Sequence, residues 1–137
     1  MANSVCEVSI TQSPLHLPPQ VDSAAVGAVV DFWGVVRALE AGREITGIEY
    51  EAHVPMAEHQ MRSLAEAAMG EFGLTKVAIQ HRIGFVPAGE ASIVVRVQSA
   101  RRADAFTANQ WIMDELKRTV PIWKNPVFKE GDSSPRA

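Results

Sequence analysis

Two adjacent arginines occupy a position that suits the binding of an anion. Arg101 and Arg102 follow a predicted strand that ends at Ser99, and they open a predicted helix. The start of a helix has free backbone N–H groups and a partial positive charge, so a phosphate bound there would relieve the repulsion between the guanidinium groups and the helix dipole. The alternative is a pair of solvated arginines with Asp104 as their local counter-charge.

Two lysines and a third arginine are further candidates for binding or catalysis. Lys117 lies in the last turn of the same predicted helix, where a cation interacts favourably with the dipole without any function. Lys124 follows the apolar residues Pro121-Ile122-Trp123, and an amine beside buried surface can act as an acid or base near neutral pH. The alternative for Lys124 is an ordinary lysine whose stem covers apolar surface. Arg37 ends an apolar strand, where either a ligand or solvent can face it.

The histidines and the single cysteine form no pattern of metal binding or nucleophilic catalysis. His16, His53, His59 and His81 lack zinc-ligand spacing, and Cys6 has no second cysteine with which to form an intramolecular disulfide. The chain contains no GxGxxG or P-loop pattern and no recognisable Ser-His-Asp or Cys-His set. We therefore expect no metal ion, no classical nucleotide site and no acyl-enzyme.

The size and charge of the chain restrict its class. The 137 residues are enough for one domain, residues 1–137, and the 47% of hydrophobic residues can supply its core. The net charge of -3 lacks the basic excess of nonspecific nucleic-acid binders, and no stretch approaches the roughly 20 apolar residues that span a membrane. A single cysteine fits a reducing compartment. We expect a cytoplasmic protein without nucleic-acid or membrane partners.

Apolar periodicity and turn residues predict the elements that position these candidates. The predicted strands are Val5–Thr11, 25–36, 45–52, 77–83, 93–97 and 122–128, and the predicted helices are 55–72 and 102–118. The strand 25–36 is almost continuously apolar, which predicts a central strand covered on both faces. The second helix is expected to place Phe106, Asn109, Ile112, Met113 and Leu116 on one side.

This order of elements predicts an α+β fold in which two helices pack on a mostly antiparallel sheet. Gly73 is expected to end the first helix and Pro121 the second, with a turn at 40–43 between two strands. Residues 131–137 are polar and are expected to form a mobile tail.

Four segments, taken together, resemble the large, catalytic subunit of molybdopterin synthase. They are residues 27–37, 48–57, 81–90 and 99–124, and the last of them contains Arg101, Arg102, Lys117 and Lys124. Each segment alone is modest, but their order and spacing make the resemblance specific. Residues 1–22 match poorly, and residues 129–137 form the predicted tail.

The resemblance implies a fold of the α/β hammerhead type and a homodimer. It also implies that a small ubiquitin-like sulfur-carrier subunit ending in Gly-Gly binds at each end, giving a heterotetramer. The C-terminal thiocarboxylate of this carrier would enter a pocket and pass two sulfur atoms, successively, to cyclic pyranopterin monophosphate. The product would be the dithiolene of molybdopterin. No cofactor is implied, and the lone Cys6 is consistent with an enzyme that carries no persulfide of its own.

The resemblance also implies roles for individual residues. Lys117 and Lys124 match the two lysines of the family's reaction centre, where they would orient the thiocarboxylate and assist proton transfer or stabilise negative charge. Arg37 and Arg102 match arginines of the pterin and phosphate pocket, and the helix-start residues would come from across the dimer interface. Four further residues would merely flank the pocket: Val35, Val36, Asn125 and Pro126.

Three departures from the family pattern motivate a rival function. The family usually has histidine at the position of Arg101, lysine at that of Val35, and Lys-Glu at that of Asn125-Pro126. An arginine at position 101 still binds phosphate but cannot exchange a proton near pH 7. The rival is a binding protein that docks the sulfur carrier or a phosphorylated ligand without turnover.

Overall fold

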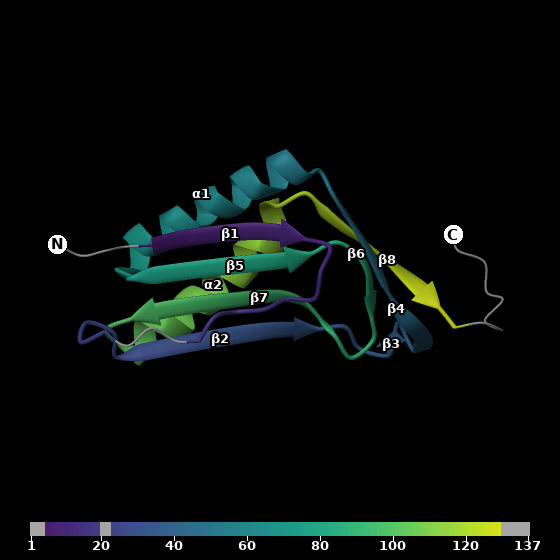
Figure 1. Cartoon of the computed structure of the whole chain (residues 1–137), viewed down its shortest axis with the longest axis horizontal. Coiled ribbons are helices and arrows are strands. Elements are labelled where there is room, and N and C mark those ends of the chain that lie inside the picture. The colour runs from purple at the N-terminus through teal and green to yellow at the C-terminus, as the bar shows by residue number, and fades with distance from the viewer. Residues whose placement is uncertain (1–4, 20–22, 130–137) are drawn as a thin grey trace.

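A computed structural model describes residues 5–19 and 23–129, and its elements form an α+β arrangement (Figure 1). The elements, in chain order, are β1 (Val5–Thr11), β2 (Ala28–Val35), β3 (Leu39–Glu40), β4 (Arg43–Ala52), α1 (Val54–Phe72), β5 (Lys76–Arg82), β6 (Gly84–Pro87), β7 (Ala91–Ser99), α2 (Arg102–Thr119) and β8 (Ile122–Phe128). The predicted tail 131–137 lies outside the described residues.

The larger sheet carries both helices and most of the core. Its strand order is β1-β5-β7-β2, in which only the β1–β5 pair is parallel. Both helices lie on the same side of this sheet (Figure 1), and buried residues such as Met61 of α1 and Ile112 of α2 pack with Ile79 and Val95 of the strands. The predicted fold, two helices on a mostly antiparallel sheet, is therefore confirmed.

A second, smaller sheet was not predicted as a separate unit. Strand β4 is its centre and pairs in antiparallel fashion with β3, β6 and β8. Val36, Ile45, Ile48 and Val86 form its own small core. Strand β6 was not predicted, because it has only four residues and both of its end residues, Gly84 and Pro87, are typical of turns. Such a segment is too short to show an alternation of apolar and polar residues.

The helix boundaries follow the sequence signals. Pro55 lies in the first turn of α1, and Gly73 ends it in a left-handed conformation with φ 64°, which glycine adopts without steric cost. The buried stripe of α2 contains Ala105, Ala108, Asn109, Ile112 and Leu116. Phe106 was predicted to pack on this side but is 61% exposed, because it lies about 100° around the helix from Ala105. Neither helix combines the length and apolarity needed to cross a membrane.

The prediction that 25–36 forms a central strand is wrong. Among the described strands, β2 pairs only with β7 and is an edge strand (Figure 1). Phe32 and Trp33 are 42% and 41% exposed, and Val35 is 52% exposed. A continuous apolar run indicates that both faces of a strand suit burial, but it does not determine whether strands of the same chain pair with both of its edges.

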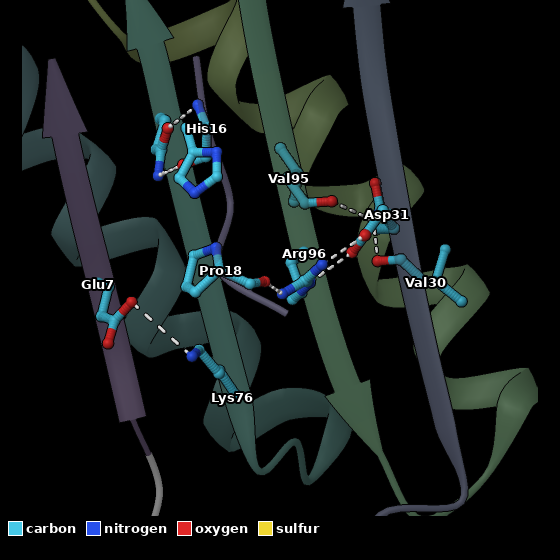
Figure 2. A network of polar contacts seen from close by, with 10 residues as sticks. Glu7, His16, Pro18, Val30, Asp31, Lys76, Val95 and Arg96 are labelled. Carbon is cyan, nitrogen blue, oxygen red and sulfur yellow. Dashed lines mark hydrogen bonds and ion pairs between the residues drawn. The ribbon is translucent and has the colours of Figure 1, made fainter. Parts of the chain in front are cut away.

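The face of the larger sheet opposite the helices is crossed by the segment after β1. Two side chains of the sheet hold this segment: Gln80 exchanges hydrogen bonds with the backbone of His16, and Arg96 Nη1 donates to the carbonyl of Pro18 at 2.6 Å. Figure 2 shows Arg96 between Pro18 and Asp31, whose carboxylate accepts two hydrogen bonds of 2.8 Å from the guanidinium. One buried cation thus links β7, β2 and the crossing segment.

We expect Asp31→Ala to destabilise the fold by about 3 kcal/mol, because it leaves the buried guanidinium of Arg96 without its counter-charge. Chemical denaturation would measure the loss. The control is Glu115→Ala, which removes the partner of the exposed Arg118 and should cost less than about 1 kcal/mol. Equal effects of the two variants would show that the Asp31–Arg96 pair contributes no more than a surface ion pair.

Candidate functional site

A cavity of about 370 Å³ lies where the two sheets and the end of α2 meet. Its walls come from β2, β4, β5, β7, α2 and β8, so residues far apart in the sequence share one space. The lining residues are Phe32, Gly34, Val35, Tyr50, His81, Ser92, Ile93, Met113, Leu116, Lys117, Val120, Ile122 and Lys124. This volume lies within the range typical of small-ligand sites.

The two candidate lysines line this same cavity. Lys117 is in the last turn of α2, and Lys124 is on β8, where it pairs in register with Tyr50 of β4. The extended residues 120–122 connect the helix end to the strand, because Pro121 prevents continuation of α2. Neither lysine forms an ion pair with another of the residues described.

The electrostatic character of the cavity is basic. Of the described residues in its lining, none carries a carboxylate, while two carry ammonium groups. Two unpaired cations in a partly enclosed space attract an anion more strongly than they would in open water. The arrangement is therefore suited to an anionic ligand with an apolar part, since the remaining walls are mostly aliphatic and aromatic.

Lys124 differs in one respect from the sequence-based expectation. The apolar residues before it predicted an amine beside buried surface, yet both Lys124 and its neighbour Trp123 are exposed. Strand β8 lies at an edge of the smaller sheet, which leaves these side chains uncovered within one chain. Lys124 therefore lies at the open side of the cavity rather than in its interior.

The arginine pair at the start of α2 lies far from the lysines. Arg101 and Arg102 are exposed at the N-terminal end of the helix, and the side chain of the N-cap residue Arg101 makes no capping hydrogen bond. Arg102 and Lys117 are roughly 22 Å apart along the helix axis, at about 1.5 Å per residue. One chain therefore does not bring the predicted phosphate receptor and the two lysines together.

The remaining predicted site residues divide between cavity and core. Val35 lines the cavity, whereas Val36 is 3% exposed and belongs to the core of the smaller sheet. Arg37 is exposed two residues after Val35 and is not in the lining. Asn125 and Pro126 pair with β4 beyond Lys124 and are also outside the lining.

Sequence reasoning missed His81, Tyr50 and Ser92 as cavity residues. His81 was read only as a member of an alternating strand, but it is 5% exposed and lines the cavity. Burial lowers the pKa of its imidazole from the ordinary 6.5, although a hydrogen bond to the backbone of Arg82 acts in the opposite direction. Within residues 5–19 and 23–129, no group of three or more His, Cys, Asp or Glu side chains could hold a metal ion.

Comparison with known proteins gives consistent matches over most of the chain. The model of the MoaE protein family matches residues 10–119. The molybdopterin synthase catalytic subunit of Thermoplasma volcanium is 38% identical over 135 residues, which cover 98% of both chains. The protein of the same name from Arabidopsis thaliana is 38% identical over 112 residues, 82% of this chain but only 57% of that longer one.

Solved structures share the fold. The crystal structure of molybdopterin synthase from Staphylococcus aureus matches with a TM-score of 0.79 and 31% identity, over 89% of this chain and 91% of that one. A chain from the protein-protein complex of subunits 1 and 2 of the molybdopterin-converting factor of Helicobacter pylori matches with a TM-score of 0.63 and 21% identity, over 81% of this chain and 77% of that one. The second likeness concerns the fold alone.

Proposed function

Because the chain belongs to the MoaE protein family, we propose that it is the catalytic subunit of a molybdopterin synthase. In this function it transfers sulfur from the C-terminal thiocarboxylate of a small ubiquitin-like carrier ending in Gly-Gly to cyclic pyranopterin monophosphate. Two such transfers form the dithiolene of molybdopterin and open the cyclic phosphate. The chain, residues 1–137, acts as one domain, and its setting is the cytoplasm.

The observation that carries this proposal is the presence of Lys117 and Lys124 in one basic cavity. Both substrates are anions: one ends in a thiocarboxylate, and the other bears a phosphate. Paired ammonium groups can hold the thiocarboxylate and stabilise the negative charge that develops during the transfer. An amine that loses its proton can also accept one from the reacting groups.

A second copy of the chain supplies the missing arginines in our proposal. Arg102 is too far from the lysines of its own chain to contact a ligand bound between them. The exposed edge strand β2 offers an apolar surface for such a copy, because its Phe32 lines one hollow together with Phe106 of α2, while the exposed Trp33 lies on the other face of the strand. Trp111 packs elsewhere: it is half-buried, with its ring centroid 5.9 Å from that of Phe72 of α1.

The phosphate of the substrate would bind to Arg102 and Arg101 of the second copy and to Arg37. Guanidinium groups and the free N–H groups of a helix start are a good receptor for this group. Arg101 serves as a phosphate ligand and not as a proton shuttle, because its guanidinium stays protonated. Val35, Asn125 and Pro126 flank the site, and Val36 supports it from the core.

Reconstitution tests the proposal directly. The purified chain is mixed with a thiocarboxylated Gly-Gly carrier and cyclic pyranopterin monophosphate, and dithiolene formation is followed. We expect product in proportion to the thiocarboxylate consumed, two per substrate molecule. Binding of both partners without any dithiolene would instead identify a docking protein, the function that the departures at Arg101 and Val35 favour.

A further inference from the structure

His81 is the least exposed ionisable group in the cavity, and none of the proposed steps uses it. It is 5% exposed and lies near the end of β5, in register with Ile10 of β1 and Ile93 of β7. Its ring meets that of Tyr50 edge-on, with the centroids 5.2 Å apart and the planes at 71°. These contacts fix the imidazole in one orientation at the cavity wall.

The hydrogen bond of His81 determines which ring nitrogen carries the proton. Nδ1 is 2.9 Å from the backbone carbonyl oxygen of Arg82. Because a carbonyl oxygen can only accept, Nδ1 must donate, and the neutral ring then has an unprotonated Nε2. Nε2 makes no hydrogen bond to any residue that the structure describes. The neutral imidazole therefore has one free acceptor.

Burial keeps His81 neutral, and its Nε2 places an acceptor in the same cavity as two ammonium groups. Lys117 from α2 and Lys124 from β8 share the cavity, Tyr50 faces the ring from β4, and β1 and β7 present isoleucines. Burial lowers the pKa of His81 below its ordinary 6.5, so the ring is neutral near pH 7. The ammonium groups can only donate, whereas Nε2 can accept.

We propose that Nε2 of His81 accepts a hydrogen bond from an N–H group of the molecule bound in the cavity and thereby orients it toward the two lysines. This inference rests on the proposed function. Its substrates offer two sources of such a group: the rings of the pterin and the main chain of the Gly-Gly tail. His81 is a positioning residue in this arrangement, and the lysines remain the groups that meet the reacting atoms.

The test compares His81→Phe, which keeps a ring but removes the acceptor, with His81→Gln, whose side-chain oxygen can reach a similar position. Calorimetry measures binding of cyclic pyranopterin monophosphate alone and of the carrier alone. We expect His81→Phe to weaken one of these ligands about tenfold and His81→Gln to restore most of that affinity. The weakened ligand identifies the source of the N–H group. His59→Phe, on the exposed face of α1, is the matched control and should change neither affinity.

Nitrogen NMR of the His81 imidazole tests the inference in the wild-type protein. The measurement depends neither on catalytic activity nor on the folding of a variant. We expect the neutral form protonated at Nδ1 at pH 7, and a shift of the Nε2 resonance when the identified ligand binds. Unchanged affinity of a folded His81→Phe for both ligands, or a proton on Nε2, would overturn the inference. Failure of the proposed function has a different signature, because wild-type protein would then form no dithiolene whatever the state of His81.

Discussion

Lys117→Ala is expected to lower the rate of dithiolene formation at least about 100-fold while the fold stays intact. The ammonium group of Lys117 lines the basic cavity from the last turn of α2, and removing one charged group that stabilises a developing anion typically costs this much. The helix should persist, because the loss of a cation near its C-terminal end costs only about 0.3 to 1 kcal/mol. Single-turnover assays with saturating carrier measure the chemical step directly.

Arg118→Ala is the matched control for this prediction. Arg118 is the next residue of the same helical turn, but its side chain is 68% exposed and paired with Glu115. The Arg118→Ala substitution removes a cation at the same end of the helix dipole, but Arg118 does not line the cavity. Turnover should therefore change less than about twofold. Near-normal turnover by Lys117→Ala would remove Lys117 from the reaction centre and leave it a structural residue of the helix end.

Lys124→Ala and Lys124→Arg extend the same experiment to the second lysine. Arginine keeps the positive charge but does not readily exchange a proton. We expect turnover to be lost in the alanine variant, in parallel with Lys117→Ala, and full rescue by arginine would mean that Lys124 acts only through its charge. Loss in both variants would assign it a proton-transfer step.

Much of the fold was predictable because local signals decide it. Val5–Thr11 and 122–128 are strands at the predicted bounds, and α1 ends at Gly73 as its sequence indicates. The placement of β2 was not predictable in this way. An apolar run reports that a strand suits burial, whereas the position of that strand in the sheet depends on pairings between distant segments.

The candidate site was predictable only in part, because some of its residues are brought together by contacts between distant segments. The two lysines were assigned to the site by the family resemblance, because their charge and positions alone also fit a helix-end cation and an ordinary surface lysine. His81 did not, since an alternating strand position shows only which face of the strand a residue occupies. What makes His81 distinctive is its neighbours, which come from β4, α2 and β8 and meet it only in the folded chain.

Mixing two inactive variants is expected to restore activity if each site combines residues from two copies of the chain. Lys117→Ala and Arg102→Ala should each be inactive alone, because each removes one necessary group from every site. In a mixed dimer, one site receives both defects and the other receives neither. Random exchange of subunits makes about half of the dimers mixed, so about one quarter of all sites, and of wild-type turnover, should return.

The control is a mixture of Lys117→Ala with Lys124→Ala. Both lysines line the cavity of the same chain, so every site in a mixed dimer still lacks one of them, and no activity should return. If the Lys117→Ala and Arg102→Ala mixture also stays inactive although native mass spectrometry shows mixed dimers, Arg102 does not serve the other copy's cavity. The separation of roughly 22 Å along α2 would then mean that Arg102 binds no ligand held by Lys117 in either chain, and that the phosphate is bound by other residues.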